Sequence, residues 1–276
     1  MSQPQTTELP ATVPAAHRRA IGVDFGGTGT KGGIVDLDTG ELVGTRFRIP
    51  TPQPATPEAV AETVAQIVEE LQARPDAPAP DSPVGIAFPA IIKNGVALSA
   101  ANIDKSWIGT DVDSLMTRRL GRPVEALNDA DAAGLSEAVY GAGRSVGGLV
   151  IVLTLGTGIG SALVQDGRLV PNAELGHLEI DGYDAETRAA SSVKDREGLS
   201  YSEWAKRLQR YYERLEALLW PDLIVVGGGV SRKADKFLPL LKLKSEIVPA
   251  KLLNTAGIVG AAWLAGDRKQ HPDQLK

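Results

Sequence analysis

A turn rich in glycine and threonine lies near the start of the sequence and has the residue types that bind phosphate. The turn consists of Gly26, Gly27, Thr28, Gly29 and Thr30. Glycine lets an anion approach the backbone amide groups, while the threonine hydroxyls and the following Lys31 add donors and a positive charge. Asp24, just before the turn, could hold a Mg²⁺ ion that bridges phosphate oxygens. This stretch therefore predicts a site for a phosphate chain.

The segments on both sides of this turn exclude two common phosphate-binding motifs. Apolar residues alternate over residues 21–25 and resume at residues 34–35, which predicts a strand before and after the turn. The G-x-x-x-x-G-K-S/T pattern of a Walker A loop is absent, and a dinucleotide fingerprint would be followed by a helix. A phosphate turn between two strands therefore indicates another α/β fold, and a plain glycine-rich hairpin is the alternative.

A second copy of the pattern favours the phosphate site over the plain hairpin. Residues 148–164 again predict a strand, a turn and a strand. The turn of this copy consists of Gly156, Thr157 and Gly158. Each copy continues into a hairpin, at residues 38–43 and at residues 166–170. We therefore expect two similar halves, whose turns could face each other across a cleft and hold one phosphate chain.

Asp129 is the candidate general base. A strand predicted over residues 123–127 is followed by Asn128 and Asp129, and a helix is predicted over residues 130–140. Because Asn and Asp are favoured at helix N-caps, a capping role is the simpler interpretation. The carboxyl end of a strand is also where α/β folds bind ligands, and a carboxylate there could accept the proton of an attacking hydroxyl during phosphoryl transfer.

Glu174 and His177 follow the second hairpin, and their side chains suit the hydroxyl groups of a sugar. Carboxylates, amides and imidazole can each take a fixed donor or acceptor role toward a hydroxyl. A zinc site is disfavoured, because the sequence has no cysteine and no other histidine near His177. A purely structural histidine is the alternative for His177.

Three consecutive glycines end a buried strand predicted over residues 223–226. They are Gly227, Gly228 and Gly229. Glycines at the end of a strand let a flat ring lie on the backbone, so they predict an adenine or ribose site, with a simple turn as the alternative.

Several basic residues are candidates for a track that holds a long polyanion. They are Lys31, Lys105, Arg144, Lys206, Arg207, Arg210 and Arg214. The last four lie on a helix predicted over residues 200–220, and a solvated helix face is the simpler interpretation there.

The composition is that of an ordinary α/β protein of 276 residues with a net charge of −5. This acidic balance gives no general attraction to nucleic acid or to an anionic membrane. The absence of cysteine excludes disulfides and a cysteine nucleophile. No apolar run approaches the roughly 20 residues of a membrane helix, and residues 1–19 lack the apolar core of a secretory signal. We therefore expect a disordered arm over residues 1–19 and a cytoplasmic location.

The chain resembles the sugar kinases of the ROK family, and more closely those members that use both polyphosphate and ATP. The resemblance extends from Ala20 to Ala265. The segments that carry it are DFGGTGTKGGIVD, GIAFPA, NDAD, LGTGIGSAL, ELGH, VVGGGVS and NTAGIVGAA. Each segment alone is a weak signal, but together and in this order they are specific to the family.

The resemblance implies an α/β fold of the actin-like or ribonuclease-H-like kind, with two lobes and the active site in the cleft between them. The small lobe would comprise residues 20–127, with a C-terminal helix over residues 255–265 packing back on it. The large lobe would comprise residues 128–254.

The resemblance also implies roles for individual residues. Asp129 would be the base toward the 6-hydroxyl of glucose, and Mg²⁺ would lie near Asp24. The residues implied to bind sugar hydroxyls are Asn128, Glu174, His177 and Glu186. The cysteine-rich zinc motif of the wider family is missing between His177 and Glu186, as in polyphosphate-using members, so no zinc is expected.

The substrates implied by the resemblance are glucose or mannose as the acceptor and polyphosphate or ATP as the donor. A homodimer that binds neither nucleic acid nor membrane is implied as well. Two alternatives stay open: a kinase that uses only ATP and phosphorylates another hexose, and a sugar-sensing regulator without catalysis. The short acidic chain argues against the regulator.

Overall fold

The computed structural model describes residues 18–101 and 103–268 of the chain. Residues 1–17 of the predicted arm lie outside the described residues, and Arg19, its last residue, already belongs to the first strand. The polar tail that contains His271 also lies outside them. Within the described residues, no helix has both the length and the apolar character needed to cross a membrane.

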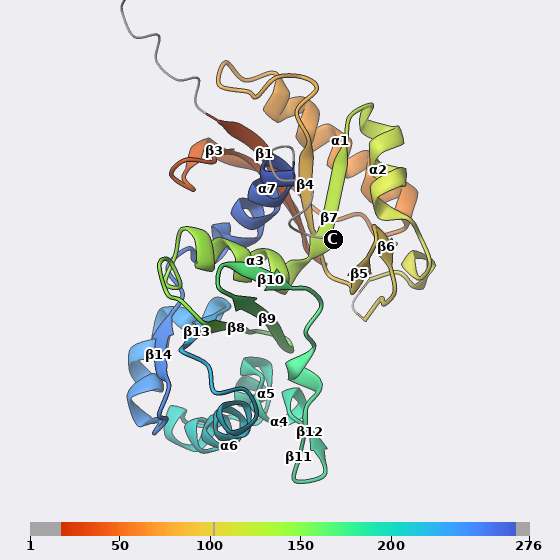
Figure 1. The fold of residues 1–276 in the computed structure, drawn as a ribbon. Coiled ribbons are helices and arrows are strands. Elements are labelled where there is room, and N and C mark those ends of the chain that lie inside the picture. The colour runs from red at the N-terminus through yellow and green to blue at the C-terminus, as the bar shows by residue number, and fades with distance from the viewer. Residues whose placement is uncertain (1–17, 102, 269–276) are drawn as a thin grey trace, which may run out of the picture.

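The first half of the chain forms a five-stranded sheet with the strand order β3-β2-β1-β4-β7 (Figure 1). Its strands are β1 (Arg19–Phe25), β2 (Thr30–Asp36), β3 (Leu42–Ile49), β4 (Val84–Phe88) and β7 (Val124–Asn128). The first three pair in antiparallel fashion, while β4 and β7 extend the sheet in parallel. Two helices, α1 (Pro57–Gln72) and α2 (Val112–Leu120), pack along this sheet.

The second half repeats this arrangement in a sheet with the order β10-β9-β8-β13-β14. Its strands are β8 (Leu149–Leu155), β9 (Ile159–Gln165), β10 (Arg168–Val170), β13 (Leu223–Gly227) and β14 (Glu246–Pro249). Again three antiparallel strands are followed by two parallel ones. The prediction of two similar halves is confirmed.

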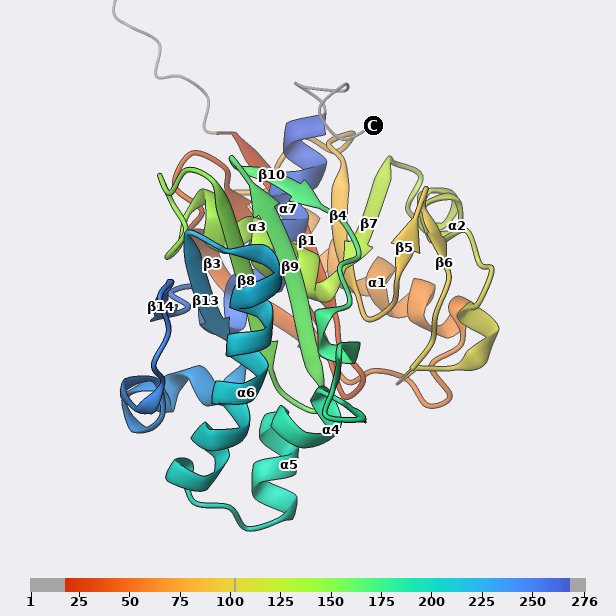
Figure 2. The same cartoon turned by 60° about the horizontal axis from the view of Figure 1, so that its bottom comes forward.

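Two helices, α3 (Asp129–Val139) and α7 (Ala256–Arg268), lie between the two sheets (Figures 1 and 2). The packing is too close for larger side chains. A Cβ atom on Gly85 would lie 1.8 Å from the carbonyl oxygen of Ala261, and one on Gly260 would lie 1.8 Å from that of Ala132. Glycine therefore allows α7 to pack against both β4 and α3, and the last helix returns to the first sheet.

The outer face of the second sheet is covered by α6 (Tyr201–Leu219), which begins with a capping box between Ser200 and Glu203. One side of this helix packs into the core, where Trp204, Leu208 and Tyr211 are buried. Trp107, in the first half, is also fully buried and packs on aromatic rings of that core. It anchors its loop and does not line a ligand site.

Shorter elements connect these layers. The short strands are β5 (Ile92–Lys93), β6 (Val96–Ala97), β11 (Glu179–Ile180) and β12 (Tyr183–Asp184). The short helices are η1 (Lys105–Trp107), η2 (Leu175–His177), α4 (Glu186–Ala189), α5 (Ser191–Arg196), η3 (Gly229–Lys236), η4 (Leu238–Leu240) and η5 (Leu253–Thr255). Most residues predicted to have a chemical role lie at strand ends or in these connections.

Candidate active site

The first Gly-Thr turn joins β1 to β2 and is shaped by two buried threonines. The Oγ1 hydroxyl of Thr51 donates to the carbonyl oxygen of Gly26 at 2.5 Å and lies 3.1 Å from Oγ1 of Thr30. Thr30 is fully buried. Its hydroxyl supports the turn from the inside, and contact of this residue with phosphate stays a prediction.

The tip of the same turn is exposed at Gly27 and Thr28. Within the described residues, the backbone N–H groups of these two positions donate to no backbone acceptor. Unpaired N–H groups at an exposed glycine-rich turn are suited to an anion. The turn therefore offers a phosphate both amide donors and the hydroxyl of Thr28.

Asp24 and Lys31 form an ion pair beside this turn. The Nζ atom of Lys31 lies 3.0 Å from Oδ2 of Asp24, with 31% and 20% of the two side chains exposed. Gly257, in the first turn of α7, lies against the same carboxylate, because a Cβ atom there would be 3.1 Å from the Asp24 Cγ atom. The positive end of the α7 dipole and the Lys31 ammonium thus both lie next to Asp24.

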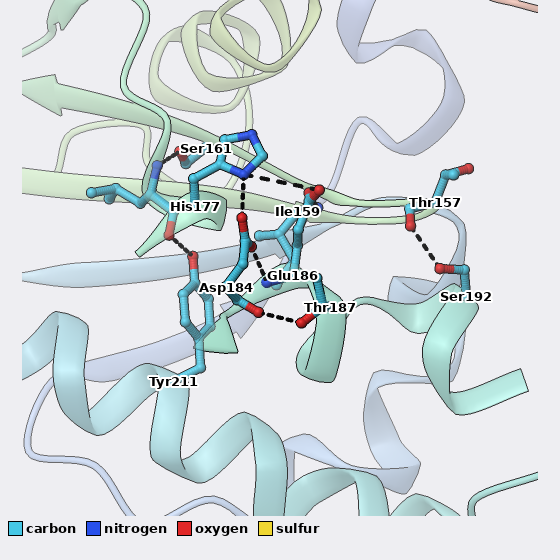
Figure 3. A network of polar contacts seen from close by, with 10 residues as sticks. Thr157, Ile159, Ser161, His177, Asp184, Glu186, Thr187, Ser192 and Tyr211 are labelled. Carbon is cyan, nitrogen blue, oxygen red and sulfur yellow. Dashed lines mark hydrogen bonds and ion pairs between the residues drawn. The ribbon is translucent and has the colours of Figure 1, made fainter. Parts of the chain in front are cut away.

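The second Gly-Thr turn joins β8 to β9 and is fastened to α5. The N–H group of Gly156 donates to the carbonyl oxygen of Gly158 at 3.0 Å, which closes the turn. The hydroxyl of Ser192 donates to the carbonyl oxygen of Thr157 at 2.6 Å (Figure 3). Thr157 is exposed, and its N–H group has no backbone acceptor among the described residues. Like the first turn, this turn therefore offers an anion an exposed N–H group and a threonine hydroxyl.

Asn128 is the N-cap of α3, so the capping interpretation is confirmed for this residue. Its Oδ1 atom accepts hydrogen bonds from the N–H groups of Ala130 and Asp131, at 2.8 and 3.1 Å. Its Nδ2 atom donates to the carbonyl oxygen of Ala90 at 3.2 Å. One hydrogen of the side-chain amide is left for a ligand hydroxyl.

Asp129 follows the cap, and its carboxylate has an unusual environment. Protein atoms surround it although it remains accessible to solvent, and this loss of hydration is the main cause that raises the pKa of Asp129 to about 6. The negative charges of Asp24 and Glu174 raise its pKa further. Carboxylates from β1 and from the loop before η2 therefore act on the carboxylate at the start of α3.

Asp131 lies two positions further along α3 and is almost fully buried, with 1% of its surface exposed. Its Oδ2 atom accepts the N–H group of Asn172 at 2.8 Å, and its Oδ1 atom has no partner among the described residues. Burial, with smaller effects from the charges of Glu174 and Asp129, raises the pKa of Asp131 to about 7. The sequence reasoning did not single out this residue.

The loop that carries Glu174 and His177 is held in place by backbone contacts. The Oγ atom of Ser161, on β9, accepts the N–H group of Leu175 at 2.8 Å, and the Tyr211 hydroxyl donates to the carbonyl oxygen of Leu175 at 3.2 Å (Figure 3). Glu174 itself is exposed and makes no side-chain hydrogen bond with the described residues. Its carboxylate is free to accept a ligand hydroxyl.

His177 is oriented by two acidic residues of the next segment. Its Nδ1 atom lies 2.8 Å from Oδ2 of Asp184 and 4.0 Å from Oε1 of Glu186 (Figure 3). The hydrogen bond to Asp184 is the main cause that raises the pKa of His177. Glu186 is held in turn, because its Oε2 atom accepts the N–H group of Ile159 at 3.0 Å. Ile159 directly follows the second turn, so His177 and Glu186 lie next to it.

His177, Asp184 and Glu186 are also the one group of three or more His, Cys, Asp or Glu residues, among those that the structure describes, whose atoms lie close enough together to hold a metal ion. Their ligand atoms lie within 4.8 Å of one another. The Nδ1 atom of His177 and the Oε2 atom of Glu186 already have protein partners at hydrogen-bond distances. The hydrogen bonds account for this arrangement without a metal.

The three predicted nucleotide glycines lie at the end of β13, close to the second turn. A Cβ atom on Gly228, whose φ is 81°, would lie 2.3 Å from the carbonyl oxygen of Leu155. Leu155 is the residue before Gly156, so the glycines and the turn are neighbours. Gly229 is exposed and has open space around it, as a flat ring would require, whereas Gly227 is buried in the strand.

Two of the four basic residues on the predicted face of α6 have acidic partners. Arg207 pairs with Glu197 at 2.7 Å, and Arg210 pairs with Asp181 through its Nη2 atom at 2.9 Å. Lys105 donates to the carbonyl oxygen of Ala100 in its own loop. These contacts favour the interpretation of a solvated surface over that of a polyanion track.

The structure thus places His177 and Glu186 beside the second turn, and Asp24 and Lys31 beside the first. Asp184 is the clearest residue that sequence reasoning missed. Its spacing of seven residues from His177 carries no pattern, and only the β11-β12 hairpin brings the two side chains together.

Comparison with known proteins gives the same family that the motifs suggested. Residues 20–198 match the ROK family. The chain is 52% identical over 260 residues to a polyphosphate glucokinase of Mycobacterium tuberculosis, and the match covers 94% of this chain and 95% of that protein.

Solved structures with the same fold include two kinases. An inorganic polyphosphate/ATP-glucomannokinase from Arthrobacter sp. strain KM is 63% identical, with a TM-score of 0.86 and coverage of 91% of this chain and 99% of that one. A ROK family glucokinase from Streptomyces griseus, solved with glucose and AMPPNP, is 25% identical, with a TM-score of 0.77 and coverage of 90% and 99%. The expected two-lobed, actin-like fold is confirmed.

Proposed function

The chain belongs to the ROK family, and we propose that it transfers a phosphoryl group from inorganic polyphosphate or ATP to the 6-hydroxyl of glucose. The observation that carries this proposal is that the charges of Asp24 and Glu174 act on Asp129, while Asp24 and Lys31 lie beside an exposed Gly-Thr turn. Phosphoryl transfer needs a base, a phosphate cradle and positive charge close together. This arrangement supplies all three.

Asp129 is the base in this proposal. With a pKa of about 6, most of its carboxylate is ionised at pH 7, and it is basic enough to accept the proton of the attacking hydroxyl. The N-cap bond of Asn128 fixes the first turn of α3 and therefore the position of Asp129. As the hydroxyl attacks the terminal phosphorus, the bond between that phosphorus and the rest of the donor breaks, and the proton moves to Asp129.

The sugar would be held by side chains from three elements. Asn128 donates from its free amide hydrogen, and Glu174 and Glu186 accept from hydroxyl groups. His177 offers its Nε2 atom, since Nδ1 is occupied by Asp184. Because the partners are fixed by bonds to Ser161, Ile159 and Asp184, little ordering would be needed when the sugar binds.

The residues around Asp24 fit a Mg²⁺ ion. Lys31 lies on Oδ2 of the Asp24 carboxylate, which leaves Oδ1 for a cation. The carboxylates of Asp24 and Asp129 repel each other, as the raised pKa of Asp129 shows, and a divalent cation would offset this repulsion. When bound, Mg²⁺ would neutralise charge on the transferred phosphoryl group. Asp24 would hold it from the protein side.

Both donors would share the phosphate positions at the two turns. ATP would place its adenosine against Gly228 and Gly229, next to the second turn. Lys31 and the amide groups at Thr28 and Thr157 would then stabilise the negative charge on the phosphoryl oxygens. In this proposal, the triphosphate of ATP and the polyphosphate chain use the same phosphate site.

Other parts of the proposal follow from the relatives. Mannose is proposed as a second acceptor because the Arthrobacter relative is called a glucomannokinase. We propose the two lobes as residues 20–127 with 255–265 and residues 128–254, with the cleft between them closing on the sugar. A homodimer in the cytoplasm completes the proposal.

The test is the formation of glucose 6-phosphate from polyphosphate free of nucleotide, with ATP in a parallel reaction, both with Mg²⁺. Product from both donors is the expected result. Asp129→Asn, which keeps the shape but cannot accept the proton, serves as the control. Product from ATP alone would reduce the proposal to an ATP-dependent kinase, and no product from either donor would overturn it.

A further inference from the structure

Two arginines on β3 lie beside the first Gly-Thr turn. The Nη2 atom of Arg48 donates to the carbonyl oxygen of Thr28 at 3.2 Å, and its guanidinium lies where a side chain on Gly29 would otherwise be. The Nη1 atom of Arg46 donates to the carbonyl oxygen of Asn254 at 3.0 Å. Both arginines are exposed.

Neither arginine has an acidic partner. Within the described residues, no carboxylate forms an ion pair with Arg46 or Arg48. Of the candidate basic residues on α6, Arg207 and Arg210 are both paired with acids. Arg46 and Arg48 therefore offer positive charge on β3, next to the first turn, that no acid of the described residues neutralises.

These side chains form a row with Lys31. Lys31 and Arg48 are directly opposite each other in the β2-β3 pairing, so they share one face of the sheet. A Cβ atom on Gly33, two residues from Lys31, would lie 4.0 Å from Cγ of Arg46, which places Arg46 on the same face. Alternate residues of a strand are about 7 Å apart. The row therefore leads from Asp24 outward along β3.

The row also runs beside the segment that connects the nucleotide glycines to Asp24. Ala250, at the start of this segment, lies near Gly227, while Gly257, at its end, touches Asp24. Asn254, which accepts the hydrogen bond from Arg46, lies between the two. A phosphate chain leaving the first turn would thus meet Arg48 and then Arg46 before reaching solvent.

We propose that Arg48 and Arg46 form a binding track for the phosphate units of inorganic polyphosphate that lie beyond the transferred one, a proposal that rests on the proposed function. Guanidinium groups suit this task because their planar N–H forks match phosphate oxygens and they stay charged at every physiological pH. Their present acceptors are backbone carbonyls, which a charged phosphate oxygen would readily replace. Long chains would gain more from the track than ATP, which ends after three phosphates.

The experiment compares Arg46→Ala, Arg48→Ala and Arg48→Lys with the wild-type enzyme. KM and kcat are measured for glucose phosphorylation with long-chain polyphosphate, with tripolyphosphate and with ATP. Losing one charged contact to phosphate should raise the KM for long-chain polyphosphate roughly tenfold in each alanine variant. The KM for ATP should rise much less in the same variant. Arg48→Lys, which keeps the charge, should recover part of the loss.

Arg168→Ala is the matched control. Arg168 is an exposed arginine on β10, the strand that corresponds to β3 in the second half, and it makes no ion pair within the described residues. It lies at the end of β9 away from the second turn, beside Gln165. This variant should match the wild type with all three donors.

A binding measurement gives a second readout that does not depend on turnover. For wild type, the logarithm of the polyphosphate affinity should fall with the logarithm of the salt concentration, and each arginine removed should reduce that slope by about 0.7. Equal KM changes for ATP and long polyphosphate, or an unchanged salt slope, would overturn the track. Failure of the wild type to use any polyphosphate would instead overturn the proposed function itself.

Discussion

The Nδ1 atom of His177 lies 2.8 Å from Oδ2 of Asp184, and this contact leaves the other ring nitrogen, Nε2, available to a ligand. With its proton on Nδ1 donated to Asp184, the neutral ring presents Nε2 as an acceptor, and the protonated ring presents Nε2–H as a donor. Asp184 also accepts the N–H group of Glu186 through Oδ1, at 3.1 Å. One carboxylate thus positions two residues proposed to bind the sugar.

The first prediction concerns Asp184→Asn. Removing this negative charge should lower the pKa of His177 toward its ordinary value, because the bond to Asp184 is the main cause of its rise. His177 would then lose its proton at a lower pH than in the wild type. The KM for glucose should rise several-fold and kcat should fall less, since the change affects positioning of the sugar. Proton NMR titration, with His177→Gln to assign the signal, measures the pKa.

Asp181→Asn is the control for Asp184→Asn. Asp181 lies on the same β11-β12 hairpin but pairs with Arg210 at the surface, so Asp181→Asn should leave both the His177 titration and the glucose KM unchanged. If Asp184→Asn changed neither quantity, Asp184 would have no positioning role.

Much of the fold could be predicted from the sequence because its signals are local. The alternation around residues 21–25 and the repeated Gly-Thr turn identify strands and turns through backbone requirements that neighbouring residues satisfy. Asn128 at the N-cap is such a case, since the cap involves only the next three residues. The duplication followed from comparing two such local patterns.

The parts that could not be predicted depend on contacts between distant residues. Thr30 resembled a phosphate ligand in the sequence, but its partner Thr51 lies 21 positions away and buries it. Arg46 and Arg48 look like ordinary residues of an edge strand until the turn and Asn254 are placed beside them. Whether a basic side chain is free or paired depends on tertiary packing, which composition does not show.

The second prediction concerns the pH dependence of turnover. A pKa of about 6 for Asp129 means that the ionised form, which accepts the proton, is lost as the pH falls through about 6. The acid limb of the kcat/KM profile should therefore have its midpoint near that pH. Asp129→Asn should reduce kcat by roughly a hundredfold or more, because general base catalysis contributes on that order. Glucose binding, followed by calorimetry, should be retained.

A shift of the same limb tests the cause of the raised pKa. Glu174→Gln removes one of the negative charges that raise the pKa of Asp129, so the acid limb should move to lower pH. The KM for glucose should rise as well if Glu174 binds a hydroxyl. Two results together would assign the acid limb of the kcat/KM profile to another group. The limb would stay in place in Glu174→Gln, and it would also be present in the residual activity of Asp129→Asn.

The third prediction concerns stability and Asp131. The pKa of this carboxyl is about 7 in the folded protein and near 3.8 in the unfolded chain, so between these values the folded state binds more protons. Its contribution to stability is therefore fully present at low pH and is lost as the pH rises through about 7. Asp131→Asn cannot ionise and should lack this loss.

Denaturant unfolding of the ligand-free proteins at several pH values measures this effect. Since one pKa unit corresponds to about 1.4 kcal/mol, the difference in unfolding free energy should move in favour of Asp131→Asn by about 2–4 kcal/mol between acidic and mildly alkaline pH. The neutral amide still leaves one buried polar atom without a partner, which affects both ends of the range equally. Parallel pH profiles for the two proteins would show that Asp131 is not titrating in this range.

The last prediction concerns the contact between the second turn and the sugar site. A Cβ atom on Gly158 would lie 2.3 Å from Oε2 of Glu186, so Gly158→Ala must push the carboxylate away. The hydrogen bond from Ile159 to Glu186 would then break. Because the displaced group is the end of a flexible side chain, the protein should still fold, and the KM for glucose should rise about tenfold with the loss of one charged hydrogen bond.

Gly147→Ala is the control, since nothing lies within 4 Å of a Cβ atom there. A normal glucose KM in Gly158→Ala would mean that Glu186 does not contact the sugar.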